Sequence, residues 1–409
     1  MKWVNSFLML LFLCILCEVS AHKQTPISLL QSSLLVDKKI VMGAEQISVY
    51  LPMLVDKRVA VCGNQTSRVG NAHLVDTLLS NGVELVKIFS PEHGFRGTAE
   101  AGALISSSVD TKTGLPIISL YGKNKKPTAE QMQGIDVVLF DIQDVGCRFY
   151  TYISTLHYVM EAAAENGVAV IILDRPNPNG NFVDGPVLEE KYRSFVGMHP
   201  IPVVHGMTIG EYGMMINGEK WLANGIQCDL SVVSMENYDH TCRYTLPIAP
   251  SPNLQTDTAI ALYPSLCLFE GTDISVGRGT SIPFMCYGHP LLNSGDFYFE
   301  PLPIKGVSEN PLHNGKKCRG YNLTAKYAQI LVNGNSFDIS YLLEAYRAFP
   351  NKDKFFTNAN FFDKLAGNST LRWQIINGRD EVTIRNSWQE KLQQFKKIRK
   401  KYLLYKDFE

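Results

Sequence analysis

A carboxylate, an imidazole and a guanidinium lie within five residues of one another in segment 90–97, Ser-Pro-Glu-His-Gly-Phe-Arg-Gly. Glu92 attracts attention because a carboxylic acid beside the apolar Phe95 has the features of a proton donor to a glycosidic oxygen. An alternative of equal weight is an ion pair between Glu92 and Arg96 that holds the loop. His93 is either a catalytic base or a hydrogen-bonding residue of the same loop.

A second dense group of polar side chains follows the apolar run 136–142. Arg148 and Tyr150 come directly before an expected helix, where we expect them to contact an anion or a sugar. Asp144 is interpreted either as a second catalytic carboxylate or as a residue that caps the following helix. Asp141, at the end of the apolar run, is expected to have a structural role.

A third group lies in segment 270–280, Glu-Gly-Thr-Asp-Ile-Ser-Val-Gly-Arg-Gly-Thr, where the glycines allow the backbone to approach a ligand. Glu270 is the expected partner carboxylate of Glu92 across a cleft, and Arg278 is expected to bind substrate. Asn64, which follows an early apolar run, is a further predicted substrate-binding residue. Turn formation is the alternative for the whole segment.

Alternating strands and helices must position these side chains. The pattern predicts a Rossmann-like α/β fold with a doubly wound parallel sheet, because short apolar runs alternate with helical stretches. We expect strands at 58–62, 83–89, 136–142 and 168–173, and helices at 73–79 and 151–165. Ligands bind beyond the carboxyl ends of such strands, which is where the first two polar groups lie.

The pattern of alternating strands and helices ends near residue 240, after which prolines divide the chain into irregular segments. We therefore predict a Rossmann-like domain over 22–240 and a smaller α+β domain over 241–409. The site is expected in the cleft between them, with 251–253 along its wall. Trp388, Leu392 and Phe395 belong to one apolar stripe at helical spacing, which indicates packing.

The first residues resemble an export signal. Lys2 precedes an apolar run, and Val19-Ser20-Ala21 supplies the small residues typical of a cleavage site. We expect a signal peptide over 1–21 and an exported protein, either periplasmic or secreted. No stable membrane span is expected after cleavage, and an uncleaved anchor helix is the alternative.

Composition excludes several functional classes. The chain has 39 Lys and Arg against 39 Asp and Glu, so its charge gives no reason to bind nucleic acid. It contains no Walker loop, no Gly-x-Ser-x-Gly and no Gly-x-Gly-x-x-Gly after the first expected strand, which argues against nucleotide hydrolases, serine hydrolases and nicotinamide dehydrogenases. Because no cysteine or histidine cluster has zinc spacing, we expect neither a metal nor a cofactor.

Four motifs occur in a fixed order, at 91–97, 141–152, 174–178 and 270–280. Together they resemble the NamZ-type exo-β-N-acetylmuramidases, formerly a domain of unknown function, over nearly the whole chain after the signal. The resemblance implies a glycoside hydrolase that releases terminal β-linked N-acetylmuramic acid from the non-reducing end of peptidoglycan fragments. It also implies that the catalytic glutamate is Glu92 and that the partners are peptidoglycan-derived saccharides.

An arginine is the natural binding partner of the lactyl carboxylate of N-acetylmuramic acid, and the candidates are Arg96, Arg148 and Arg278. One alternative is a muropeptide-binding protein without catalysis that serves cell-wall recycling. Another is an esterase or amidase whose nucleophile is Ser90 or Cys147.

Overall fold

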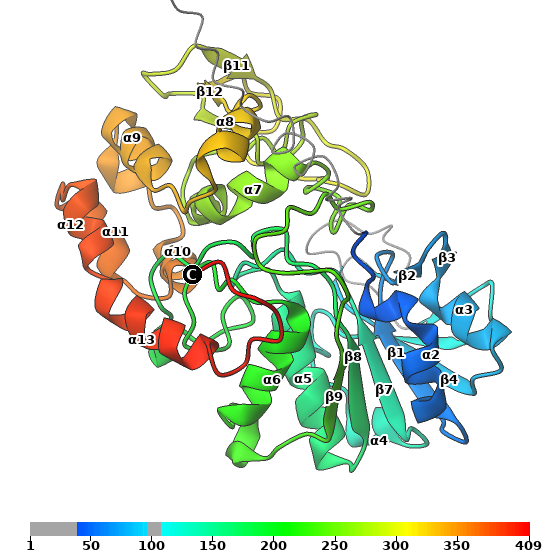
Figure 1. Cartoon of the computed structure of the whole chain (residues 1–409). Coiled ribbons are helices and arrows are strands. Elements are labelled where there is room, and N and C mark those ends of the chain that lie inside the picture. The colour runs from blue at the N-terminus through cyan, green and yellow to red at the C-terminus, as the bar shows by residue number, and fades with distance from the viewer. Residues whose placement is uncertain (1–38, 93, 96–107) are drawn as a thin grey trace, which may run out of the picture. The chain divides into compact units, whose positions relative to one another are not determined.

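The protein is described by a computed structural model that covers residues 39–92, 94–95 and 108–409 (Figure 1). Residues 40–409 form one compact unit. The predicted signal peptide, His93 and Arg96 lie outside the described residues, so the assignments made to them stay predictions.

A seven-stranded sheet organises the first half of the described chain, in the order β5-β6-β4-β1-β7-β8-β9. All neighbouring strands are parallel except β5 and β6. The strands are β1 (Val59–Gly63), β4 (Leu85–Ser90), β5 (Ser108–Val109), β6 (Pro116–Ser119), β7 (Val137–Asp141), β8 (Ala169–Leu173) and β9 (Leu230–Val233). A short hairpin, β2 (Arg68–Val69) with β3 (Ala72–His73), stands apart from this sheet.

Both faces of the sheet are covered, which explains why its central strands are apolar throughout. Ala60 and Cys62 of β1 belong to one core, whereas Val59 and Val61 belong to another, because successive side chains point to opposite faces. The first core includes side chains of α5 (Tyr152–Glu165) and α6 (Ile209–Gly218), which pack on β8 (Figure 1). The second includes side chains of α2 (Ile47–Tyr50) and α3 (Leu74–Ser80).

The predicted α/β class and the elements expected in this half are confirmed, with bounds that differ by one or two residues. The predicted helix at 73–79 is α3, which begins one residue later because His73 is its N-cap and accepts a hydrogen bond from the Val75 N–H. The hydrophobic pattern of the sequence did not predict two short elements, the strand β6 and the four-residue helix α4 (Ala129–Met132).

The remainder of the chain is mainly helical with a small antiparallel sheet, as the α+β prediction required. Its sheet has the order β10-β12-β11, formed by β10 (Cys286–His289), β11 (Phe297–Phe299) and β12 (Cys318–Asn322). Its helices are α7 (Asp257–Leu266), α8 (Lys326–Asn333), α9 (Ser340–Ala348), α10 (Ala359–Ala366), α11 (Thr370–Ile376), α12 (Glu381–Asn386) and α13 (Gln389–Arg399).

One apolar core joins the parallel sheet to this second part. It contains Phe140 of β7 and Phe269 of the later chain, together with Trp388, Leu392 and Phe395 of the predicted helical stripe, all of them buried. The stripe is therefore packing, as expected. The boundary between 240 and 241 stays a prediction. Among the described helices, none is long and apolar enough to cross a membrane.

The order of the strands shows where a ligand belongs. After β1 the chain adds β4 on one side of β1, and later it adds β7 on the other side. The direction of winding therefore reverses at β1. Ligands of open α/β sheets bind beyond the carboxyl ends of the strands at this point. Glu92 follows β4, Asn64 follows β1, and Tyr150 follows β7.

Candidate active site

A cavity of about 510 Å3 lies beyond the carboxyl ends of these strands. One wall comes from loops that follow β4, β6 and β7, and the opposite wall comes from the second part of the chain. The lining residues are Glu92, Tyr121, Phe149, Tyr150, Thr151, Tyr152, Phe195, Val196, Ser251, Asn253, Leu254, Tyr263, Glu270, Arg278, Phe284, Val307, Ser308, Glu309, Asn310 and Phe361. Its volume is that of a small-molecule site.

Glu92 is held in this cavity by the side chain of Thr151, which directly precedes the crossover helix α5. The Thr151 hydroxyl, one residue before α5, donates a hydrogen bond to Glu92 Oε2 at 2.9 Å. Tyr121 lies near the same carboxylate: burial and the charge of Glu92 together raise the pKa of its phenol. The phenol thus remains a proton-bearing group beside Glu92 at neutral pH.

Glu270 and Arg278 come from the predicted segment 270–280 and form an ion pair on the opposite wall. Arg278 Nε lies 2.8 Å and Nη2 2.6 Å from Glu270 Oε1. Burial lowers the pKa of Arg278, whereas the nearby Glu270 carboxylate raises it by a larger amount. The pKa of Arg278 is therefore above its usual value. The guanidinium also lies 5.0 Å from the centre of the Phe284 ring. The pair is therefore a fixed, charged feature of the cavity.

Aromatic rings form the cavity's apolar surface. Tyr150 packs edge-on against Tyr152 and Tyr263, with ring centres 4.9 and 5.8 Å apart. Burial is the main reason that the pKa of Tyr150 is raised well above its usual value. Polar Ser251 and Asn253 complete this part of the wall, as expected for segment 251–253. Such a surface suits a sugar ring, which has both apolar and hydroxyl-bearing faces.

Arg148, in contrast, does not line the cavity. Its side chain is fully buried, and its Nη1 and Nη2 atoms donate to the backbone carbonyls of Pro186, Ile201 and Leu365, each at 2.7 Å. Burial lowers the pKa of this arginine to about 9. The guanidinium thus joins three loops outside the cavity lining, and substrate binding by Arg148 stays a prediction that this position does not support.

Asn64 and Asp144 lie behind the wall and do not line the cavity. Asn64 is buried and donates from Nδ2 to the Tyr152 hydroxyl at 3.0 Å, so it supports a lining residue. Asp144 Oδ1 accepts the Gly146 N–H at 2.7 Å, whereas its buried Oδ2 has no hydrogen-bond partner among the described residues. Burial raises the pKa of Asp144 to about 7. Their direct roles in catalysis and substrate binding therefore stay predictions, and the structure places both side chains behind the lining.

The structure also bears on the covalent alternatives. Cys147 is fully buried outside the cavity lining, and burial raises the pKa of its thiol well above the usual value. A thiol in that state is a poor nucleophile. Ser90 is likewise buried and absent from the lining. Asp141 has the structural role expected of it, since its Oδ2 accepts from Arg175 Nη2 at 2.9 Å.

Three histidine and aspartate side chains come close enough together to raise the question of a metal. Within the described part of the chain, the ligand atoms of Asp273, His289 and His313 lie within 4.8 Å of one another. His289 Nδ1 accepts the Leu291 N–H at 2.9 Å, so its proton sits on Nε2, 3.1 Å from Asp273 Oδ2. The cluster is thus arranged as a hydrogen-bonded network, with the proton where a metal would need a lone pair.

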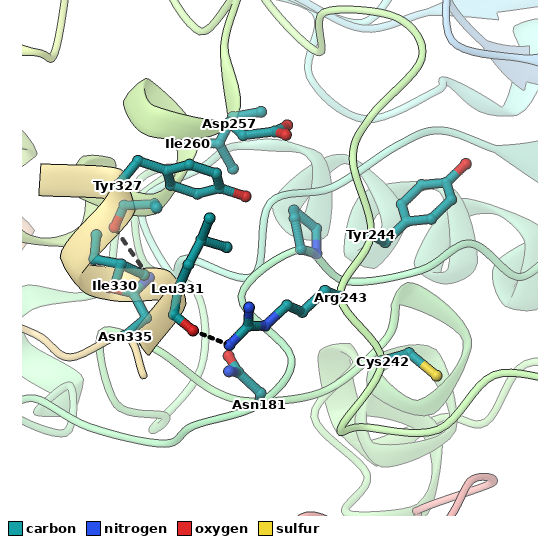
Figure 2. A pocket seen from close by; sticks show the side chains of 12 residues that line it. Asn181, Cys242, Arg243, Tyr244, Asp257, Ile260, Tyr327, Ile330, Leu331 and Asn335 are labelled. Atoms are coloured by element: carbon teal, nitrogen blue, oxygen red, sulfur yellow. Dashed lines mark hydrogen bonds between the residues drawn. The ribbon is translucent and has the colours of Figure 1, made fainter. Parts of the chain in front are cut away.

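A smaller pocket is unsuited to a sugar. Figure 2 shows Arg243 bonded to the Leu331 carbonyl in this pocket, which Asp257 and Tyr327 also line. The volume of this pocket is about 60 Å3, which is that of about two water molecules.

Comparison with known proteins identifies the family of the chain. Two family models match, the N-terminal part of the exo-β-N-acetylmuramidase NamZ at residues 59–258 and its C-terminal part at residues 261–405. The chain belongs to the NamZ family. The peptidoglycan β-N-acetylmuramidase NamZ of Bacillus subtilis (strain 168) is 41% identical over 378 residues, which are 87% of this chain and 89% of the relative.

Two solved structures share the NamZ family fold. Both are proteins of the DUF1343 family from Bacteroides fragilis NCTC 9343, and each match covers 90% of this chain and 99% of the other. The first is 46% identical with a TM-score of 0.83, and the second is 30% identical with a TM-score of 0.76.

Three of the four NamZ-like motifs converge on the cavity, through Glu92, Tyr150 and Arg278 and their neighbours, whereas 174–178 supplies none of its lining. Sequence reasoning missed Tyr121, although it follows β6 in the same way that Glu92 follows β4. It also missed Phe195 and segment 307–310, which lie in irregular chain without a periodic signal.

Proposed function

We propose that the protein is an exo-acting glycoside hydrolase that releases terminal β-linked N-acetylmuramic acid from the non-reducing end of peptidoglycan fragments. The observation that carries the proposal is the cavity itself. It brings the Glu92 carboxylate, the Arg278 guanidinium and aromatic rings together at the switch point of the sheet. The 41% identity to a peptidoglycan β-N-acetylmuramidase supports the same reaction and substrate.

Glu92 is the catalytic carboxyl group of this proposal. As a general acid it gives its proton to the glycosidic oxygen while the bond from that oxygen to the anomeric carbon breaks, and water supplies the hydroxyl of the released sugar. The hydrogen bond from Thr151 to Oε2 helps to fix the orientation of the carboxyl group in the cavity. Orientation of this kind is worth a large part of a catalytic step.

Arg278 is the proposed receptor of the lactyl carboxylate, which distinguishes N-acetylmuramic acid from N-acetylglucosamine. Its Nε and Nη2 atoms are engaged by Glu270, whereas Nη1 makes no hydrogen bond to the described residues. That free N–H edge can donate to a carboxylate oxygen. Arg148 is buried and does not line the cavity, and Arg96 lies outside the described residues.

The test is to incubate the purified protein with a chromogenic β-N-acetylmuramide and with the matching glucosaminide. We expect colour from the muramide and little from the glucosaminide. Glu92→Gln should lower kcat by at least about 100-fold, because the amide cannot donate the proton. Glu130→Gln, which changes an exposed carboxylate outside the cavity lining, is the matched control and should keep activity.

Absence of turnover by the folded wild type, with saturable binding of muropeptides, would replace the enzyme by the binding-protein alternative. A Glu92→Gln variant with full activity would remove Glu92 from the mechanism while leaving the reaction in place.

We further propose that the protein is exported and works outside the cytoplasm, where its polymeric substrate is found. The apolar run and small residues before residue 22 support this location. N-terminal sequencing of the protein from cell fractions tests it, with a mature N-terminus at His22 as the expected result. Full-length protein retained in the cytoplasm would contradict it.

A further inference from the structure

A second cavity, of about 430 Å3, shares no lining residue with the first. It lies where the chain leaves the C-terminal end of α6 and meets the loop before it. Its lining residues are Leu188, Glu190, Arg193, Met198, His199, Pro200, Lys220, Trp221, Leu222, Ala223 and Asn224. Nothing in the proposed hydrolysis makes use of this cavity.

Trp221 gives the cavity a fixed aromatic surface. Its indole stacks on the His199 ring, with centres 4.8 Å apart and planes inclined by 17°. His199 is itself held by Tyr212 and His157, at 2.8 and 2.9 Å from its two ring nitrogens. Burial, followed by the nearby charges, lowers the pKa of His199 well below its usual value, so the stack stays neutral. An indole fixed in this way loses little entropy when a ligand packs on it.

Two cations line the same cavity and are not neutralised by the protein. The side chains of Arg193 and Lys220 form neither an ion pair nor a hydrogen bond with any of the described residues. Glu190 is the one acidic residue in the lining and is exposed to solvent. The cavity therefore carries a net positive charge beside an apolar ring, which favours a ligand with both a carboxylate and an apolar face.

The backbone at Lys220 adds an independent indication. Lys220 has a φ of 56°, and the Trp221 N–H donates to the Ile216 carbonyl at 3.0 Å, which is the pattern that closes a helix with a left-handed residue. Glycine is usual at that position because a side chain costs stability there. Asn224, also in the lining, has a φ of 56° as well.

We propose that this cavity is a second, non-catalytic binding site for a carboxylate-bearing sugar chain. Trp221 would pack against the apolar face of one sugar, while Arg193 and Lys220 would bind its carboxylate. The choice of peptidoglycan as the polymer rests on the proposed function, whereas the chemistry of the site does not. Such a site holds the enzyme on the insoluble polymer while a chain end occupies the first cavity.

Lys220→Gly and the double variant Arg193→Gln/Lys220→Gly test the proposal, with Lys400→Gln as the control. Lys400 is an exposed lysine that directly follows α13 and is absent from the lining. Lys220→Gly removes the cation and also relieves the left-handed strain, so its melting temperature should stay the same or rise. Loss of binding in a protein of undiminished stability cannot come from misfolding.

The measurement is cosedimentation with insoluble peptidoglycan, together with kcat/KM on the small chromogenic muramide. We expect the double variant to bind the polymer about tenfold more weakly, since two charge-assisted contacts are lost. We expect kcat/KM on the small substrate, and polymer binding by Lys400→Gln, to remain those of the wild type. Chitin, which lacks the carboxylate, should bind the wild type weakly and the double variant equally weakly.

Undiminished binding of the double variant to peptidoglycan would overturn the proposal, as would an equal loss in Lys400→Gln. A loss of chitin binding of the same size as that for peptidoglycan would overturn recognition of the carboxylate. These outcomes are distinct from failure of the proposed hydrolysis, in which the wild type would bind the polymer but release no sugar from the small substrate.

Discussion

The Thr151 hydroxyl donates a hydrogen bond to Glu92 Oε2 at 2.9 Å, which connects the loop after β4 to the start of α5. The two residues come from adjoining regions of the sheet's switch point. A hydrogen bond between them fixes the orientation of the carboxyl group. Thr151 is thus a positioning residue for the proposed acid.

We expect Thr151→Val to lower kcat by about tenfold and to change KM little, because the carboxyl group loses its orientation while the cavity keeps its shape. Thr151→Ser retains the hydroxyl and should restore most of the activity. Steady-state kinetics on the chromogenic muramide measure both. Equal activity of the Val and Ser variants would show that the hydroxyl does not position Glu92.

Replacement of Arg278 should change selectivity more than activity on neutral sugars. Arg278→Gln removes the proposed partner of the lactyl carboxylate, so we expect kcat/KM for the muramide to fall by about 10- to 100-fold. The low activity on the glucosaminide, which has no carboxylate, should change by far less. The ratio of the two specificity constants is the measurement, and an unchanged ratio would assign lactyl recognition to another residue.

The predicted fold and the predicted site differ in how far local sequence determines them. Buried strands such as β7 and β8 are apolar along their whole length, so their position could be predicted, and the loop after β4 then places Glu92 by topology alone. Glu270 needed one more assumption, a cleft between the two halves of the chain, and the cavity brings both carboxylates into one lining.

Arg148 shows why the rest could not be predicted. Its partners are carbonyl groups of Pro186, Ile201 and Leu365, the last of which lies 217 positions further along the chain. A backbone carbonyl leaves no mark on the sequence, so the motif alone cannot separate a buried structural arginine from one that binds substrate. Burial, which depends on the packed tertiary structure, decides between them.

A substitution at Arg148 should therefore affect stability before catalysis. Arg148→Met would leave three buried carbonyl groups without their donor, and we expect a loss of roughly 3–5 kcal/mol in the free energy of unfolding. Arg148→Lys should be intermediate, since an ammonium cannot reproduce the planar fork. Urea unfolding measures the change. A stable Arg148→Met protein with a raised KM would return Arg148 to the substrate site.

Asp144 should make stability depend on pH in a direction opposite to that of a paired carboxylate. Burial raises its pKa from 3.8 in the unfolded chain to about 7 in the folded protein. Between these values the folded state holds a proton that the unfolded state has released, so this residue's contribution to stability falls as pH rises and levels off above about pH 7. An asparagine stays neutral throughout that range.

We therefore expect Asp144→Asn to gain roughly 2 kcal/mol of stability relative to the wild type between pH 5 and pH 8, measured by urea unfolding at both values. Asp136→Asn is the control. Hydrogen bonds from Arg58 lower the pKa of Asp136, so its contribution changes only in acid and should be constant over this range. A difference between Asp144→Asn and the wild type that is the same at both pH values would mean that Asp144 is ionised in the folded protein. Its buried charge would then act on Tyr150 in the cavity wall, although the carboxylate itself does not line the cavity.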